Sequence, residues 1–253
     1  MANVILGVTN ILARSGSEAA VRMEQGGYQL LLLDFPAQMQ SAVDLIRSGS
    51  PPELGAEVAR GLFGALTESW LYRNRYIIDA LPRVPPEARV VCIGDEGDER
   101  QLMDQKVSIS LLEYRSLAGR IDPSRWRREL ERVVMSDSEV ARRYSARLLR
   151  ELEGERNCLC VLGPWGRKLK EDVERRGHAC QVVVFGQPYL GTPLEVLMSE
   201  IASGDVSDER IHFLVELHLD FFRRYLTVSR NVDEAYDRWL SEGQWVKLLK
   251  ASG

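Results

Sequence analysis

The clearest architectural signal in this sequence is the stretch Cys158-Leu159-Cys160-Val161-Leu162-Gly163-Pro164-Trp165-Gly166-Arg167-Lys168. Its first half is an apolar run too short for a helix, and the run ends abruptly in Gly-Pro-x-Gly. Beyond the turn, Leu169 and Val173 follow helical spacing. The pattern predicts a buried strand, a tight turn and a helix. Since open parallel sheets bind ligands at the carboxyl ends of their strands, this turn marks the expected edge of a site.

The same alternation of strand and helix runs through the preceding residues. The order predicts an α/β, Rossmann-like fold: a doubly wound, mostly parallel sheet of about five strands with helices on both faces. Within residues 101–155 we expect helix starts at Asp122-Pro123-Ser124 and at Ser136-Asp137-Ser138. The other expected strands are residues 4–10, 28–33, 89–93 and 179–185, and the other expected helices are residues 15–25, 38–47 and 53–81.

From Thr192 onward the sequence shows only helical patterns, with starts expected at Thr192, Ser207 and Asn231. We therefore expect two domains, an α/β domain of residues 1–190 and a helical C-terminal extension of residues 191–253 that acts as a cap or a dimerisation element. Aromatic residues recur there at a spacing typical of a core or a partner seam. They are Phe213, Phe221, Phe222, Tyr225, Tyr236, Trp239 and Trp245.

Composition narrows the class of protein. The chain has 253 residues, of which 45% are apolar and 28% charged, as in folded soluble proteins. A net charge of −4 does not favour a nucleic-acid partner. No apolar run approaches the roughly 20 residues that span a bilayer, so we expect a cytoplasmic protein without membrane contact. The basic residues are mostly arginine, as in proteins of thermophiles or of GC-rich genomes.

Polar residues follow the expected strand ends, where they would face one crevice. Asp34 and Asp95 are the candidate catalytic residues, because two carboxylates in one site can hold a divalent cation or act as acid and base. The alternative is that each caps the following helix. No residue is assigned as a metal ligand, and the cofactor stays open. The candidate ligand-binding residues are Asn10, Glu96, Arg142, Gly163, Trp165, Gly166, Arg167, Lys168 and Gln187.

Arg167 and Lys168 are expected to open the helix after the 163–166 turn. A helix start disfavours each cation by about 0.3–1 kcal/mol, and a bound anion would offset this cost. The free N–H groups of a helix start also favour anions. A small anionic ligand, such as a nucleotide or phosphoester, is therefore one candidate. His212 and Glu216 share a helical face as a metal pair would, although such pairs are more often surface or core contacts.

The order of these turns resembles the TraB-like branch of the superfamily that includes the ChaN and erythromycin-esterase-like proteins. The resemblance covers residues 4–185 and implies the same fold and pocket, with metal-dependent hydrolysis in active members. That family has histidines in its first and last turns, where this chain has Asn10 and Gly166. The matching segments are Gly7-Val8-Thr9-Asn10, Leu33-Asp34, Ile93-Gly94-Asp95, Arg142-Arg143-Tyr144-Ser145-Ala146 and Gly163-Pro164-Trp165-Gly166.

Three functional hypotheses follow. The first is a divergent TraB-like protein that binds a ligand or protein partner in the crevice with little or no hydrolase activity, because Asn is a weak ligand and Gly has no side chain. The second is a nucleotide- or phosphoester-binding protein, a nuclease or a sensor, with an anion site at residues 163–168. The third is a structural interaction protein that acts through its C-terminal helices, as a homodimer or with another protein.

Overall fold

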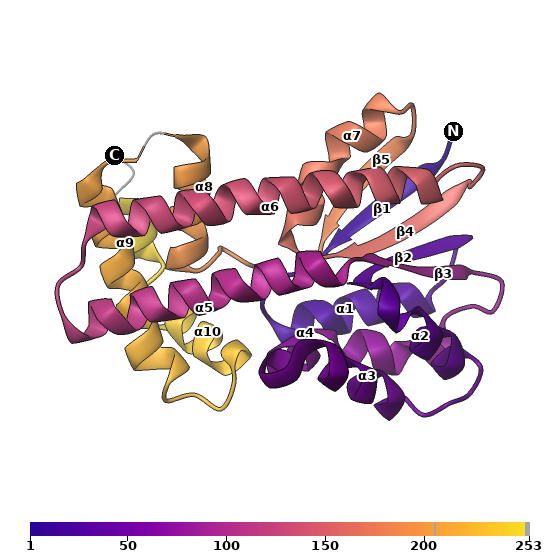
Figure 1. The fold of residues 1–253 in the computed structure, drawn as a ribbon, viewed down its shortest axis with the longest axis horizontal. Coiled ribbons are helices and arrows are strands. Elements are labelled where there is room, and N and C mark those ends of the chain that lie inside the picture. Colours follow the sequence, from indigo (N-terminus) through magenta and orange to yellow (C-terminus); the bar gives the residue numbers. More distant parts are fainter. Residues whose placement is uncertain (205, 251–253) are drawn as a thin grey trace. The chain divides into compact units, whose positions relative to one another are not determined.

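The protein contains one five-stranded parallel sheet, as the sequence predicts. The structure is a computed structural model that describes residues 1–204 and 206–250, and for residues 99, 103, 249 and 250 it describes the backbone alone. The strand order is β3-β2-β4-β1-β5 (Figure 1). The strands are β1 (Asn3–Val8), β2 (Leu30–Pro36), β3 (Arg89–Gly94), β4 (Asn157–Leu162) and β5 (Ala179–Val184).

Helices cover both faces of this sheet, which confirms the doubly wound fold. On one face lie the helices that join β1 to β2 and β2 to β3 (Figure 1): α1 (Ala13–Glu24), α2 (Gln40–Arg47), α3 (Glu53–Phe63) and α4 (Thr67–Ala80). The link from β3 to β4 is made by α5 (Glu96–Ala118) and α6 (Pro123–Glu151), and the link from β4 to β5 includes α7 (Lys170–Arg175). α6 and α7 cover the other face (Figure 1).

The sheet face beneath α6 and α7 carries a continuous apolar core. Successive strand residues point to opposite faces, so alternate positions of neighbouring strands meet on this side. α6 contributes one stripe of apolar side chains to the core. The strand residues in it include Val4, Leu6, Leu30, Leu32, Cys158, Cys160 and Leu162, and the helix residues include Val140, Tyr144, Leu148, Leu152 and Val173.

On the opposite face α1 and α4 pack unusually close together. A Cβ atom at Gly16 of α1 would lie 2.4 Å from the backbone carbonyl oxygen of Arg73 in α4. Only a residue without a side chain fits this contact, because real Cβ atoms do not approach backbone oxygens so closely. Gly16 therefore sets the distance between the two helices.

Contacts group the described residues into two compact units. One comprises residues 1–101 and 139–187, and the other residues 102–138, 188–204 and 206–250. The second unit thus joins the C-terminal helices to the segment 102–138. Whether residues 1–190 fold independently of 191–253 stays a prediction. The C-terminal helices are α8 (Pro193–Ser203), α9 (Asp208–Phe221), α10 (Val232–Ser241) and α11 (Val246–Lys250), and a π-helical turn spans Phe222–Leu226.

Much of the C-terminal aromatic pattern forms the core of the second unit. Phe221, Tyr225, Tyr236 and Trp239 are each buried. The ring centroids of Phe221 and Trp239 lie 5.6 Å apart, and those of Tyr236 and Trp239 lie 5.7 Å apart. Such tilted and edge contacts are typical of aromatic packing in a core. These four side chains pack inside the second unit and are not exposed to a partner protein. The homodimer stays a prediction.

Helix starts agree with the sequence at several positions. Thr192, Ser207 and Asn231 cap α8, α9 and α10 through their side chains. The Asp122 carboxylate accepts a hydrogen bond from the Arg125 amide at 3.1 Å, as a cap of α6 does. No helix in the part of the chain that the structure describes is long and apolar enough to cross a membrane.

Two local expectations are wrong. α6 continues without a break through the expected start at residues 136–138, where the Ser138 hydroxyl donates to the Val134 carbonyl one turn earlier instead of capping. Arg167 and Lys168 do not open an α-helix either. They lie in a 3-10 helix, Pro164–Leu169, and α7 begins only at Lys170.

Candidate functional site

The carboxyl ends of the strands meet at one edge, because the paired strands run parallel. Val8 is in register with Leu162, Leu33 with Val161, and Pro36 with Gly94. The sequence-predicted residues at positions 10, 34, 95 and 163–165 therefore stand along one rim. β1 and β2 continue to helices on one face, whereas β4 between them continues to the other. Such reversals in strand order are where open α/β sheets hold ligands.

Asp34 is the most perturbed carboxyl group at this edge. Asp34 lies inside β2, two residues before the strand ends at Pro36. Its Oδ2 accepts a hydrogen bond of 2.6 Å from the Gly163 amide. Burial away from water disfavours the carboxylate and raises the pKa of Asp34 to about 6, against the opposing effects of that hydrogen bond and of the Arg73 charge. Asp34 as a whole residue is partly exposed. Asp34 can therefore exchange a proton near neutral pH, as an acid, a base or a ligand contact requires.

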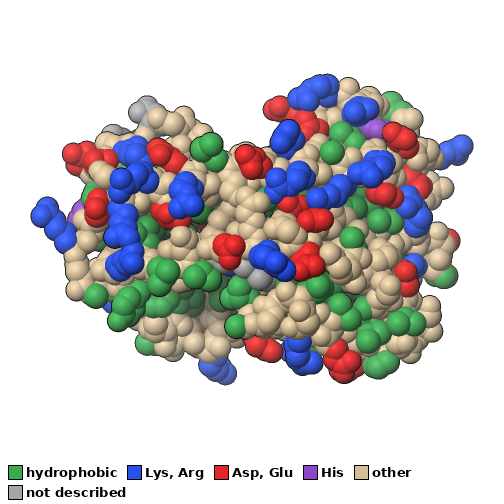
Figure 2. All heavy atoms as spheres, in the orientation of Figure 1, with side chains coloured by type: hydrophobic (Ala, Val, Ile, Leu, Met, Phe, Trp, Pro, Cys, Tyr) green, Lys and Arg blue, Asp and Glu red, His purple; other side chains and the backbone are tan. Residues whose placement is uncertain are grey.

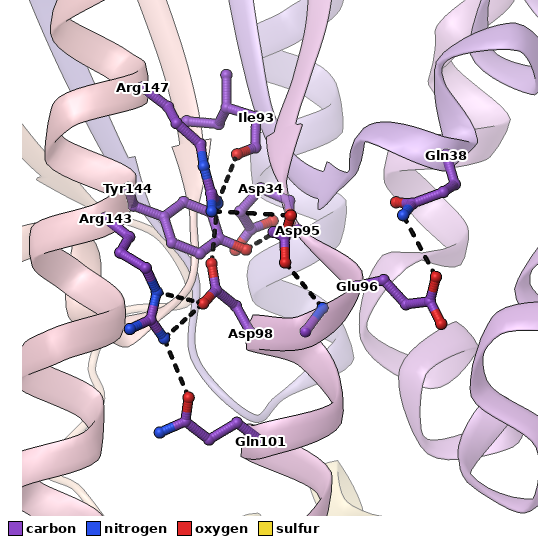
Figure 3. Close-up of polar contacts among 11 residues, drawn as sticks. Asp34, Gln38, Ile93, Asp95, Glu96, Asp98, Gln101, Arg143, Tyr144 and Arg147 are labelled. Carbon is purple, nitrogen blue, oxygen red and sulfur yellow. Dashed lines mark hydrogen bonds and ion pairs between the residues drawn. The ribbon is translucent and has the colours of Figure 1, made fainter.

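Two aromatic rings border Asp34. Tyr144 of α6 and Trp165 of the 163–166 turn pack with ring centroids 4.1 Å apart. The Tyr144 hydroxyl donates to the backbone carbonyl of Asp34 at 3.3 Å, as Figure 3 shows. The Arg147 guanidinium lies 5.4 Å from the centroid of the Tyr144 ring. Strand β2, helix α6 and the turn after β4 thus hold this side of the edge together.

Asp98, which the sequence analysis did not single out, is the centre of an ion network beside β3. It is only 3% exposed. Its carboxylate accepts from Arg143 Nε at 2.6 Å and from Arg147 at 2.9 Å (Figure 3). Arg147 also donates to the Ile93 carbonyl at 3.3 Å. Two arginines one helical turn apart in α6, facing an acidic run after a strand, are the signal that could have identified this network.

Asp95 and Glu96 lie at the start of α5 and face solvent more than Asp34 does. Asp95 Oδ1 accepts from the Gly97 amide at 2.8 Å, which is the geometry of a helix cap. The other Asp95 oxygen lies 3.9 Å from Arg147. Glu96 pairs with Arg100 at 2.6 Å. The capping interpretation of Asp95 therefore has a structural basis, and its catalytic role stays a prediction.

Asn10 is buried and holds the turn between β1 and α1. Its Nδ2 donates to the Phe185 carbonyl at 3.1 Å, and its Oδ1 accepts from the Leu12 amide at 2.9 Å. Both ends of the amide are thus engaged with backbone. Gly166 is buried too, and a Cβ atom there would lie 2.8 Å from Leu162 Cβ. The two positions where the resemblance would place histidines therefore hold a structural amide and a space too tight for a side chain.

The remaining predicted ligand residues are more peripheral. Arg142 is exposed on α6, Gln187 is exposed beyond β5, and Arg167 and Lys168 are exposed in the 3-10 helix. Among the described residues, no hydrogen bond or ion pair joins Arg142 or Arg167 to Asp34. Within residues 163–168, where the sequence predicts an anion site, the Gly163 amide donates to the carboxylate of Asp34.

His212 and Glu216 form a surface contact, with Nδ1 and Oε2 3.8 Å apart. Within the described ranges no group of three or more His, Cys, Asp or Glu side chains is arranged to hold a metal ion.

Comparisons with protein-family models, with curated proteins and with solved structures find no match to this chain. The resemblance to the TraB-like proteins stays a prediction.

Proposed function

We propose that this protein binds a small ligand at the carboxyl edge of its sheet, around Asp34, Gly163 and Trp165, with little or no hydrolytic turnover. The observation that carries the proposal is the carboxyl group of Asp34, a partly exposed residue, which the Gly163 amide holds in place at 2.6 Å. A carboxyl group that is perturbed by burial and held by a backbone amide at a reversal of strand order is typical of a binding or catalytic site. In this proposal the chain is a divergent relative of the TraB-like proteins.

Positions 10 and 166 favour binding over hydrolysis. Both polar atoms of the Asn10 amide are committed to backbone groups, at 3.1 and 2.9 Å. At Gly166 the nearest atom of Leu162 leaves no room for a side chain. A metal-dependent hydrolase of the related type would need imidazole ligands at these positions. The divalent cation expected of an active enzyme therefore has few candidate ligands here beyond Asp34 and Asp95.

A nucleotide or phosphoester site at residues 163–168 is less well supported. The Gly163 amide already donates to Asp34, and α7 has only six residues. Basic and acidic side chains lie interspersed over α6 and α7 in Figure 2, with Lys170 paired to Glu174 and Arg175 paired to Asp172. A nucleic-acid partner would need an extended basic patch, and the mixed charges on α6 and α7 do not form one in this view.

A thermal-shift screen with a library of small metabolites tests the binding proposal. We compare the full chain with Asp34→Asn, which keeps an acceptor for the Gly163 amide, and with Glu57→Gln, which alters an exposed carboxylate of α3. The proposal expects ligands whose stabilising effect is lost in Asp34→Asn and kept in Glu57→Gln. It is wrong if no ligand depends on Asp34. Hydrolysis of a model ester or peptide with Mg²⁺, Mn²⁺ or Zn²⁺ that Asp34→Asn abolishes would instead establish an enzyme.

A further inference from the structure

The sheet ends in β5 at one border and in β3 at the other (Figure 1). A border strand has outward backbone N–H and C=O groups that no strand of its own sheet pairs with, so it can take up a further strand. Natural proteins protect such borders with charged residues, proline, bulges or a covering group. The two borders of this sheet differ in these features.

The β3 border is protected. The side chain of Gln40 takes the place of a further strand there, because its Nε2 donates to the Val90 carbonyl at 3.0 Å and its Oε1 accepts from the Cys92 amide at 2.8 Å. β3 also begins with the charged Arg89, and its register with β2 shifts near the carboxyl end. A further strand would therefore find these outward groups of β3 already bonded.

Every second residue of β5 directs its backbone groups toward β1. The amides of Ala179 and Phe185 donate to the backbone carbonyls of Ala2 and Val8, both at 2.9 Å. In a parallel strand the residues that face one neighbour alternate with those that face away from it. The even-numbered residues of β5 therefore direct their N–H and C=O groups to the border. They are Cys180, Val182 and Val184.

The β5 border is open. Its outward backbone groups have no hydrogen-bond partner among the residues that the structure describes. β5 contains no charged residue and no proline, and its six residues pair with β1 without a register shift. The valines at 182–184 are partly exposed, whereas Val90 and Cys92 of β3 are buried. An open, uncharged and apolar border of this kind is the type that pairs with another chain.

We propose that β5 pairs antiparallel with β5 of a second copy of this chain across a twofold axis, so that the two sheets become continuous. A strand that pairs with itself must not set like charges opposite each other, and β5 carries no charge. The register centred on Val182 sets Cys180 opposite Val184 of the second copy. This register alone pairs all the outward residues with one another, and each opposed pair exchanges two hydrogen bonds.

The charges of α7, the helix beside this border, also suit a second copy. Residues 170–176 contain three basic and three acidic side chains. Lys170 lies 3.8 Å from Glu174, and Arg175 lies 2.9 Å from Asp172. A twofold axis along β5 brings α7 of both copies to the same border, and two helices of balanced charge do not repel each other. A strongly acidic or basic peptide would find no complementary charge there. This dimer is independent of the ligand site proposed around Asp34.

Two double variants of the full chain test the register. In the proposed dimer Gln181 lies opposite Val183 of the second copy, as a closely spaced pair without hydrogen bonds. Gln181→Lys with Val183→Lys sets like charges across the axis, whereas Gln181→Glu with Val183→Lys sets opposite charges there. Both variants carry the same change at the partly exposed Val183, so its effect on folding is matched.

Sedimentation equilibrium measures the association. We expect the wild type to form a dimer, and the dissociation constant of the like-charge variant to exceed that of the opposite-charge variant at least about tenfold. A wild type that stays monomeric at about 0.1 mM, or equal constants for the two variants, would overturn the proposal.

Amide hydrogen exchange of the wild type, followed by NMR, tests the same pairing without any substitution and decides if the variants do not fold. The amides of Cys180, Val182 and Val184 should exchange at least about tenfold more slowly in concentrated protein than after dilution below the dissociation constant. The amides of Gln181 and Val183, which face β1, are the internal control and should be protected at both concentrations. Exchange of the outward amides that does not depend on concentration would overturn the proposal even for a dimeric chain, because that dimer would use another surface.

Discussion

The amide nitrogen of Gly163 donates a 2.6 Å hydrogen bond to the carboxylate of Asp34, a residue 129 positions earlier in the chain. This bond joins the end of β2 to the turn after β4 and fixes the orientation of the carboxyl group. A hydrogen bond to a charged acceptor stabilises it by about 1.5–3 kcal/mol. The loss of water around the buried carboxylate nevertheless outweighs the bond, because the pKa of Asp34 rises to about 6.

Asp34→Asn should remove a pH dependence of stability. Since the folded-state pKa of about 6 exceeds the unfolded value of 3.8, the folded protein keeps a proton that the unfolded chain releases between these values. Stability therefore falls as pH rises through this window. Discounted for partial exposure, the loss is about 1–2 kcal/mol. Urea unfolding across the window should show this fall in the wild type and in Glu57→Gln. Parallel curves for wild type and Asp34→Asn would contradict the assignment.

Gly16→Ala should lower the free energy of unfolding by about 1–3 kcal/mol, because the new methyl group would push α1 away from α4. Its Cβ would lie 2.4 Å from the Arg73 carbonyl oxygen. Gly61→Ala is the matched control, an exposed helical glycine whose Cβ would meet nothing. That change should stabilise the protein by about 0.5–1 kcal/mol through helix propensity. Urea denaturation of both variants measures the contrast, and similar shifts would refute the close contact.

Asp98→Ala should be strongly destabilising, by about 2–4 kcal/mol, because it leaves two partly buried arginines without their shared carboxylate. Asp98 is 3% exposed and contacts Arg143 at 2.6 Å and Arg147 at 2.9 Å. Glu96→Gln, two residues away, affects only exposed contacts, those with Arg100 and Gln38, and should cost less than about 0.5 kcal/mol. Chemical denaturation compares the two. Equal costs would show that the Asp98 network contributes no more than a surface pair.

Glu113→Ala should destabilise the second unit by about 1–3 kcal/mol, since it removes the hydrogen-bond partner of a buried imidazole. The Nε2 atom of His218 lies 2.7 Å from Glu113, and its Nδ1 is buried without a partner among the described residues. Glu216→Ala, which affects the exposed pair with His212, should change stability by less than about 0.5 kcal/mol. Thermal unfolding distinguishes them. If Glu113→Ala leaves the unfolding temperature unchanged, the hydrogen bond between Glu113 and His218 does not contribute to stability.

The sequence predicts the strands and the rim of the site because both depend on local patterns. Apolar runs define β1 to β5, those of β2 to β5 with Gly or Pro at or just after their ends, and parallel strands place Asp34 and Trp165 at one edge. Three features depend on tertiary packing instead. They are the position of β4 between β1 and β2, the burial of Asp98 by arginines about 45 residues later, and the continuity of α6 through Ser136–Ser138. Local patterns carry no information about such distant partners.

The position of β1 in the sheet also constrains how the protein is made. Both neighbours of β1, which are β4 and β5, follow it in the chain by about 150 residues or more. During synthesis β1 is made long before either pairing partner. Its backbone N–H and C=O groups therefore have no strand to pair with until β4 and β5 have been translated. Nascent chains stopped before residue 157 should therefore lack the native sheet and depend on chaperones, while chains extended past residue 184 can close it.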